Sequence, residues 1–305
     1  MTRRGWVLFA LMSVIWGIPY LMIKVAVEEV SVPVLVFART VLGAVVLLPL
    51  AVRAGGLGAA RRHWPAIVAF AAFEIAIPWW LLSDAERTLS SSMSGLLIAA
   101  VPIMAALLAR MTRDTDRLGA RRWIGLAVGF GGVAVLAAPH LDGGGDALSV
   151  FEVLGTALCY AIGPLIAARK LKDVSTLAVT GAALALTTIV YLPPAVVTWP
   201  TQVPSPQVLA ALAGLGLVCT ALAFVVFLEL IGEVGTSRAM VFTYINPAVA
   251  VGAGVLILGE DLTWTIVAAF VLIIAGSILA TASGRRARVA PAPPQPDATP
   301  LSQQA

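Results

Sequence analysis

The sequence contains few charged residues. Only 12% of its 305 residues are Asp, Glu, Lys or Arg, whereas soluble domains carry about 25%. Hydrophobic residues make up 60% of the chain, and the mean hydropathy is +0.96. This composition argues against a water-soluble globular protein and predicts an all-α integral membrane protein built from spans of about 20 residues.

Histidine and cysteine are also scarce, which limits the chemistry that the chain can perform. Cys159 and Cys219 lie inside apolar runs, where a thiol usually behaves as a small hydrophobic group. The topology derived below places His63 and His140 on opposite sides of the membrane, so they cannot share a metal ion. We therefore predict no metal, no cofactor and no catalytic residue, and an intramembrane enzyme is the weakest function considered.

Apolar runs separated by charged or Pro/Gly-rich breaks predict ten transmembrane helices. The first run begins at Gly5 and continues past Ile23 without a small-residue cleavage site, so it is predicted to be a retained span. Residues 284–305 are rich in arginine and proline and are predicted to be a disordered cytoplasmic tail. The predicted spans are about 5–25, 32–52, 65–83, 90–110, 122–139, 149–168, 175–197, 207–231, 236–257 and 263–283.

Positive charges predict the orientation of these spans. If the N-terminus lies in the cytoplasm, the inner segments contain short clusters of Arg and Lys, and the outer loops contain only Arg87. Both termini are therefore predicted to be cytoplasmic, in a multi-pass protein of the plasma membrane. The same clusters explain the pI of about 9.4 without a nucleic-acid partner.

The chain contains two similar units, offset by about 144 residues. Each unit has five predicted helices, and because five is odd, the second unit must enter the membrane from the opposite face. The sequence therefore predicts two inverted repeats, at 5–139 and 149–283, which are typical of secondary transporters. The matched pairs are Pro102 and Pro247, Asp116 and Glu260, Gly132 and Gly276, Trp16 and Tyr160, Pro19 and Pro164, Lys24 and Arg169, Asp84 and Glu229, and Ser92 and Ser237.

Several of these residues form motifs of a known transporter family. The motifs are Trp16-Gly17 with Lys24, Arg39 after Pro33, and Gly259-Glu260 after Pro247. With them, residues 9–281 resemble the EamA family of the drug/metabolite transporter superfamily. The resemblance implies a ten-helix fold of two inverted five-helix repeats, with solute export or exchange by alternating access.

Two positions depart from the pattern of that family. The first unit has Thr115-Asp116 where Gly-Glu is usual, and the second unit has no arginine that matches Arg39. Neither departure affects the expected fold, but together they argue against transferring a substrate from the family.

Ionisable residues inside a span are costly and are therefore candidates for function. Glu74 lies about ten residues into the third predicted helix, close to the bilayer midplane. It could carry a coupling proton or bind a substrate amino group, and the alternative is a fixed ion pair with Arg39 or Lys24. The planar guanidinium of Arg39 suits a substrate carboxylate or phosphate, or else a permanent partner carboxylate.

Three further charged residues are candidates for coupling or gating. Lys24 lies toward the outer end of the first span, where it could bind substrate or extend its amine to the membrane interface. Asp84 is expected at the outer end of the third span. Glu229 is expected near the cytoplasmic end of the eighth span, in a gate or at a helix end.

Aromatic and amide side chains complete the predicted substrate site. Trp16 and Tyr20 are four residues apart and share a helix face, and Tyr160 takes the place of Trp16 in the second unit. Tyr244 and Asn246 precede Pro247, which lacks a backbone donor and should interrupt its helix. Carbonyl groups freed in this way could contact a solute.

The sequence thus predicts a secondary active transporter that moves a small organic metabolite, amino acid-like or drug-like, by alternating access. The family resemblance favours export, and proton coupling is one possible energy source. The expected partners are the small-molecule substrate and membrane lipid. A channel or facilitative pore for small solutes is the alternative function.

Overall fold

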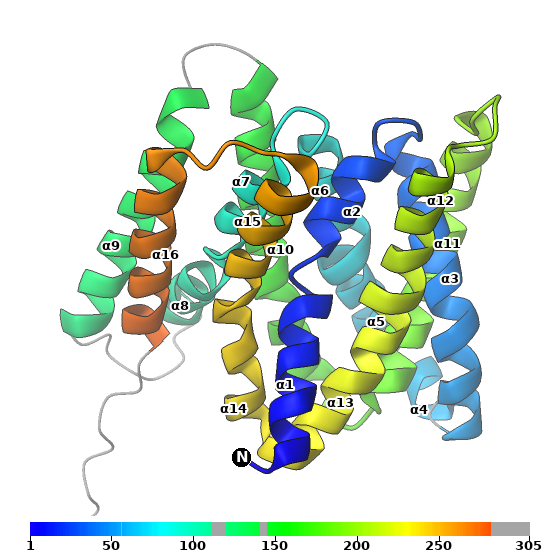
Figure 1. Cartoon of the computed structure of the whole chain (residues 1–305). Coiled ribbons are helices and arrows are strands. Elements are labelled where there is room, and N and C mark those ends of the chain that lie inside the picture. The colour runs from blue at the N-terminus through cyan, green and yellow to red at the C-terminus, as the bar shows by residue number, and fades with distance from the viewer. Residues whose placement is uncertain (56, 112–119, 141–144, 282–305) are drawn as a thin grey trace, which may run out of the picture.

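The computed structural model describes residues 1–55, 57–111, 120–140 and 145–281, and every regular element in these ranges is helical (Figure 1). The predicted tail at 284–305 and the predicted acid Asp116 lie outside these ranges. The elements are α1 (Arg3–Ile15), α2 (Pro19–Ala26), α3 (Val32–Arg53), α4 (Leu57–Arg62), α5 (Trp64–Ala71), η1 (Ala72–Ala76), α6 (Ile77–Ala85), α7 (Ser91–Ile98), α8 (Val101–Met111), α9 (Ala120–Ala137), η2 (Ala138–His140), α10 (Gly145–Lys170), α11 (Thr176–Val197), α12 (Pro206–Ala213), η3 (Gly214–Leu222), α13 (Ala223–Val234), α14 (Thr236–Ala239), η4 (Met240–Tyr244), α15 (Asn246–Leu258) and α16 (Trp264–Thr281).

Eight helical stretches of the described chain are long and apolar enough to cross a membrane. Two shorter apolar helices, Asn246–Leu258 and Trp264–Ala280, fall where the last two spans are predicted. The all-helical membrane class is therefore confirmed, whereas the count of ten spans stays a prediction. The long stretches are Arg3–Ala26, Val32–Arg53, Trp64–Ala85, Ser91–Leu108, Trp123–His140, Asp146–Lys170, Thr176–Val197 and Pro206–Val234.

Three of the predicted spans are interrupted close to a proline. α1 and α2 are separated before Pro19, α7 and α8 are separated before Pro102, and η4 separates α14 from α15 before Pro247. Proline cannot donate a backbone hydrogen bond and crowds the preceding turn, so a helix often restarts at this residue. α10 nevertheless runs through Pro164 without a break, so the matched prolines Pro19 and Pro164 have different effects.

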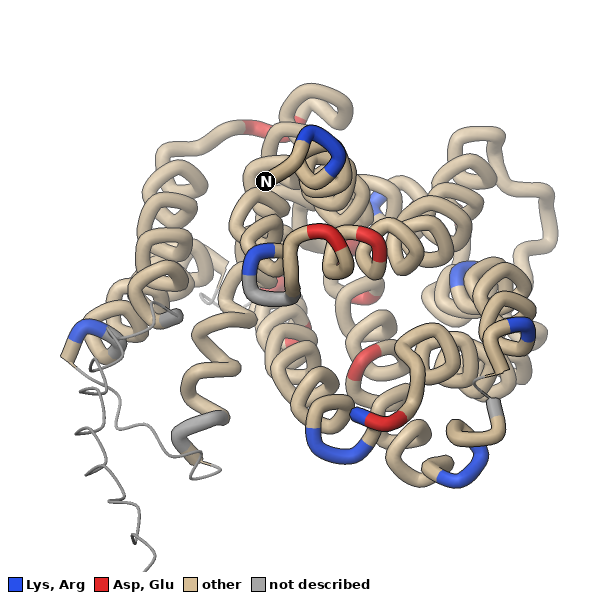
Figure 2. Tube along the Cα trace, turned by 90° about the horizontal axis from the view of Figure 1, so that it is seen from below, with Lys and Arg blue, Asp and Glu red and all other residues tan. Residues whose placement is uncertain are grey.

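We name the two ends of the bundle by their residues. The near face carries Arg3, where α1 begins, and Arg53, where α3 ends. The far face carries the connections 27–31, 86–90 and 259–263 (Figure 1). Seen from the near face, Lys and Arg lie at several separate helix ends and loops (Figure 2).

Small residues allow the closest helix contacts. α9 and α16 form a tightly packed pair beside the rest of the bundle (Figure 1). A side chain at Gly276 of α16 would collide with the backbone of Gly129 in α9, and a side chain at Gly125 of α9 would collide with the backbone of Ala280 in α16. Small residues at such positions let helix backbones approach closely in a membrane.

Candidate functional site

Two spans contain a π-helical segment near their middle. η1 lies between α5 and α6, and η3 lies between α12 and α13. Such segments are rare and are frequent at functional sites, because they disturb the regular pairing of backbone groups. In η3, the hydroxyl of Thr220 donates to the carbonyl oxygen of Leu215 at 2.8 Å, so a side chain stabilises the widened turn.

Arg39 is buried in α3, between η3 and α6. Its Nε donates to Oγ1 of Thr220 at 3.1 Å, and its guanidinium carbon lies 3.6 Å from the ring centre of Trp79. A guanidinium over an aromatic face is attracted to the ring and remains well oriented. The partners that hold Arg39 are therefore neutral groups, which leaves its positive charge available to an anionic ligand.

Glu74 lies in η1 and packs against α10. Its Oε2 occupies the space where a side chain at Gly163 would lie, so glycine is required for this close approach. The same oxygen is buried and has no hydrogen-bond partner among the described residues. No ion pair joins this carboxyl to Arg39 or Lys24 in the described part of the chain. A buried acceptor without a partner is unfavourable, and a proton or a cationic solute would satisfy it.

Two tyrosines lie near these charged side chains. Tyr160 of α10 is close enough to Arg39 and Glu74 for both charges to act on its hydroxyl. Tyr20 of α2 is buried, packs on Gly95 of α7, and is close enough to Arg39 and Tyr160 to interact with them electrostatically. The structure therefore brings four of the predicted substrate-binding residues together.

Trp16 packs in an aromatic cluster with phenylalanines of α13 and η4. Its ring contacts those of Phe224, Phe227 and Phe242, with centroid distances of 5.9, 5.2 and 5.4 Å. Its Nε1 donates to the carbonyl oxygen of Cys219 in η3 at 3.2 Å. Trp16 thus links the break in the first span to the π segment of the eighth.

Asn246 joins two helix breaks. With its amide nitrogen as donor, it bonds to the carbonyl oxygens of Phe242 at 3.1 Å and of Ser13 at 3.2 Å. The amide of Gly17 bonds to Val14, not to Ser13, so the Ser13 carbonyl is one that the break has freed. Tyr244 lies at the end of η4, half-buried, just before this junction.

The three further candidates for coupling or gating lie toward the two faces. Nζ of Lys24 donates to the backbone oxygens of Glu86 at 2.8 Å and of Leu89 at 2.9 Å, at the far end of α6. Glu229 pairs with Arg4 and so ties α13 to α1 at the near face. Asp84 pairs with Arg87 at 3.3 Å on the far face.

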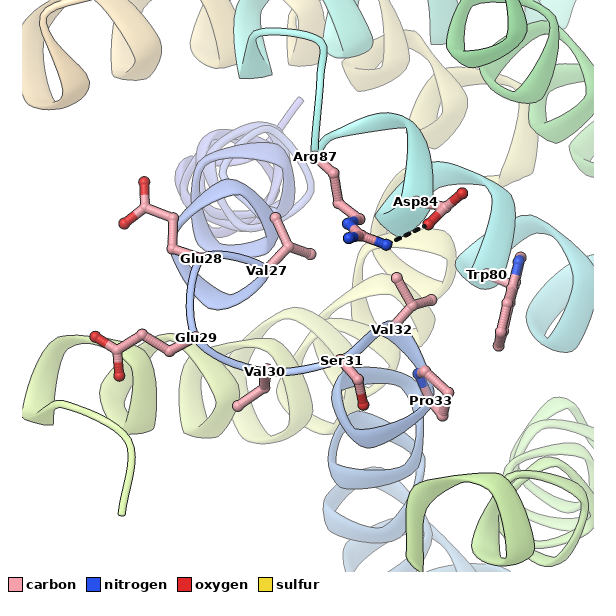
Figure 3. Close-up of a pocket in the computed structure, with 10 residues that line it drawn as sticks. All are labelled: Val27, Glu28, Glu29, Val30, Ser31, Val32, Pro33, Trp80, Asp84 and Arg87. Atoms are coloured by element: carbon pink, nitrogen blue, oxygen red, sulfur yellow. Dashed lines mark hydrogen bonds and ion pairs between the residues drawn. The ribbon is translucent and has the colours of Figure 1, made fainter. Parts of the chain in front are cut away.

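A cavity of about 320 Å³ opens on the far face, between the end of α2, the start of α3 and the end of α6 (Figure 3). Within it, Arg87 reaches toward Asp84, whereas Glu28 and Glu29 point away from this pair (Figure 3). The cavity is lined by Val27, Glu28, Glu29, Val30, Ser31, Val32, Pro33, Trp80, Asp84 and Arg87. Its location separates it from the group around Arg39 and Glu74.

Comparison with known proteins assigns the chain to a family. The model of the EamA-like transporter family matches residues 3–138 and again residues 147–282. The chain belongs to this family. EamA proteins are part of the drug/metabolite transporter superfamily, so the chain is a multi-pass membrane transporter.

Relatives and a solved structure extend the match over nearly the full length. The uncharacterized transporter YvbV of Bacillus subtilis (strain 168) is 22% identical over 293 residues, which cover 94% of each chain. An uncharacterized transporter of Archaeoglobus fulgidus is 23% identical over 283 residues, with 90% of this chain and 97% of that protein covered. A solved crystal structure is similar with a TM-score of 0.65 and 19% identity, over 91% of this chain and 96% of the other, and supports the fold alone.

One buried charged residue escaped prediction in this EamA chain. Glu86 follows α6 directly and is fully buried, although the sequence places it in a loop. The signal that could have identified it is its position one residue beyond an apolar span, within reach of Lys24 from the first span. Among the described residues, no group of three or more His, Cys, Asp or Glu is arranged to hold a metal ion.

Proposed function

We propose that this EamA protein is a secondary active transporter that exports a small organic solute by alternating access. In this proposal, the chain forms ten spans in two inverted repeats, 5–139 and 149–283, in the plasma membrane. The near face and both termini are cytoplasmic, and the far face is external.

The observation that carries the proposal is an asymmetry in the contacts of the two interrupted spans, α7/α8 and α14/α15. The far-face halves α7 and α15 pack closely, because Gly95 of α7 leaves room for Ala250 of α15 (Figure 1). The near-face halves have different neighbours, since α8 packs on α10 and α16, whereas α14 packs on α13. A bundle closed at one face is what alternating access requires of one of its two end states.

The residues near the middle of the bundle support a solute with charged groups. Arg39 presents a positive charge held only by neutral partners, and it could bind a carboxylate. Glu74 presents a carboxyl oxygen without a partner, and it could bind an amino group or a proton. We therefore propose an amino acid-like solute held between Arg39 and Glu74, with Tyr20 and Tyr160 beside it.

We propose a different role for three of the predicted substrate-binding residues, Trp16, Tyr244 and Asn246. They belong to the helix breaks of the first and ninth predicted spans, so they would contact the solute on its path rather than at the central position. Lys24 and Asp84 would act at the far face, and Glu229, through Arg4, at the near face.

The test is counter-flow in proteoliposomes with a panel of amino acids and their analogues, with and without a pH gradient. A carrier gives saturable uptake that is stimulated by the same solute on the opposite side, and proton coupling adds a response to the gradient. Glu74→Gln should abolish the response to the gradient, whereas Glu28→Gln, a change of an exposed far-face carboxyl, should behave as the wild type. Flux without saturation or counter-flow would indicate a channel, and undiminished coupled transport by Glu74→Gln would exclude a role for this carboxyl.

A further inference from the structure

Glu86 is a buried acid that the central site does not use. Its exposed fraction is 0%, and neither carboxylate oxygen has a hydrogen-bond partner among the described residues. It caps the C-terminal end of α6, just beyond the span Trp64–Ala85. Burying an ionised carboxylate without hydrogen bonds is strongly unfavourable, whereas a protonated carboxyl is tolerated far better.

The charged groups around Glu86 already have partners. Nζ of Lys24, from α2, bonds to the backbone oxygens of Glu86 and Leu89. Glu260, which follows α15, accepts from the backbone N–H of Ser91 at 2.7 Å and of Ser92 at 3.0 Å, and from the hydroxyl of Ser92. Among the described residues, the ammonium group of Lys24 bonds to backbone oxygens, and neither carboxyl oxygen of Glu86 receives a hydrogen bond.

The remaining titratable neighbours do not supply a second positive charge at close range. Arg39 of α3 acts on Glu86 more weakly than Lys24 and Glu260, and the phenol of Tyr20 lies nearby in α2. On the same connection, Arg87 is exposed and paired with Asp84, which in turn lies beside Glu152 of α10.

Charge balance at this position therefore depends on Glu86. One cation, Lys24, and one anion, Glu260, balance each other while Glu86 is neutral. Burial raises the pKa of Glu86 well above its usual range, and the like charge of Glu260 raises it further, against the opposing effect of Lys24. Partial burial alone would raise the pKa of Glu260, but the hydrogen bonds from Ser92 and Ser91 outweigh it and lower that pKa.

The same residues hold the far face closed. Glu260 places a carboxylate at the N-terminus of α7, where unpaired backbone N–H groups and the helix dipole favour an anion. This contact fastens the end of α15 to α7, the two helices that pack together at this face. Separation of α7 from α15 would bring water to Glu86, which lies five residues before Ser91.

We propose that Glu86 is a proton-binding site that controls this closure: α7 and α15 pack together while Glu86 carries a proton, and they separate when it is ionised. Closing the far face moves one proton from the water on that side to a carboxyl oxygen of Glu86, with no other bond made or broken. A proton antiporter that exports a solute must take up a proton from the far side. The role of Glu86 in coupling therefore rests on the proposed export function.

The test follows the exchange of backbone hydrogen for deuterium in the segment 87–97, whose amides at Ser91 and Ser92 are bonded to Glu260. It uses the full-length protein in detergent or nanodiscs, with no solute. The ratio of wild-type exchange to that of Glu86→Gln should rise by up to about tenfold per pH unit once the pH passes the ordinary pKa of a water-exposed glutamate, and it should level off above the raised pKa of Glu86 in the closed state. Glu86→Gln should stay protected at every pH, and Glu86→Asp, which can still titrate, should regain the pH dependence.

Glu28→Gln is the matched control, since it removes an exposed carboxyl from the same face. Equal exchange of wild type and Glu86→Gln across the pH range would overturn the proposal. If Glu86→Gln does not fold, infrared spectra of the wild type decide the question. The carbonyl band of a protonated carboxyl must be present while exchange of the segment increases with pH, and it must disappear at the upper end of that pH range. A missing band would overturn the proposal. Neither measurement involves transport, so counter-flow without a pH-sensitive far face would refute this inference and leave the transporter proposal intact.

Discussion

The carboxyl group of Glu74 lies directly against Gly163, so that a methyl group at Gly163 would overlap Oε2. This contact joins η1 in the third span to α10, the sixth span, close to Arg39 and Tyr160. The position of the candidate coupling carboxyl is therefore set by the absence of a side chain on another helix.

Gly163→Ala should displace Glu74 and impair transport without unfolding the protein. Alanine is favoured over glycine inside a helix by about 1 kcal/mol, so a loss of function would come from the displaced carboxyl and not from a weaker helix. Counter-flow per folded protein should decrease at least severalfold. Gly131→Ala in α9 is the control, because a side chain there meets no atom within 4 Å. Equal transport by both variants would show that the contact has no functional role.

The contact between Arg39 and Thr220 leads to a prediction about stability. Thr220→Val keeps the shape of the side chain but removes its hydroxyl group. This hydroxyl accepts a hydrogen bond from Nε of Arg39 and donates one to the carbonyl oxygen of Leu215. A hydrogen bond to a charged group contributes about 1.5–3 kcal/mol, so the midpoint of thermal unfolding should decrease by several degrees. Thr187→Val is the matched control, since its buried hydroxyl bonds only to the carbonyl of Ala183 in its own helix, and its loss should cost less.

Much of this architecture could be predicted from the sequence. Long apolar runs give the spans, because every backbone group in a membrane must be paired within a helix. The cost of intramembrane charge marked Arg39 and Glu74, both of which the structure places near Tyr160.

The parts that could not be predicted depend on contacts between distant segments. Glu86 lies beyond the end of a span, and it is buried only because Lys24 and the segment around Glu260 fold over that end of α6. The π segments also have no local signature, since the carbonyl at Leu215 is satisfied by a side chain five residues later. The effect of a proline on its helix could not be predicted either. Pro19 and Pro164 are matched in the two units, but the helix is interrupted before Pro19 and continues through Pro164.

Asn246 should stabilise the protein through the two hydrogen bonds that its side-chain amide donates. Asn246→Ala removes two bonds and leaves the freed carbonyl of Ser13 without its side-chain partner, at a cost of about 1–3 kcal/mol for a buried acceptor. Asn246→Asp should be worse, because an ionised aspartate has only acceptors and would face two carbonyl oxygens. Thermal unfolding should therefore give the order wild type, then alanine, then aspartate. An aspartate variant as stable as the wild type would mean that the amide does not donate to these carbonyls.

The cap that Glu260 provides for α7 should be lost in acid. Because hydrogen bonds from Ser92 and Ser91 lower the pKa of Glu260, the closed face binds the ionised form more tightly than the protonated form. The resulting stabilisation is fully present above the ordinary glutamate pKa, about 4.3, and it disappears as the pH falls through the lowered value.

Glu260→Gln tests this prediction, because the neutral amide cannot supply the charge at any pH. At pH 7 the variant should unfold at a lower temperature than the wild type, by an amount that corresponds to the loss of a helix N-cap, about 0.5–2 kcal/mol. The two proteins should become equally stable as the wild-type carboxylate is protonated, since both then present a neutral side chain to the N–H groups of Ser91 and Ser92. Glu28→Gln should match the wild type throughout, because this carboxyl is exposed on the same face. A stability difference between wild type and Glu260→Gln that persists at low pH would show that the carboxylate charge does not hold α7, and that the shape of the side chain accounts for the effect.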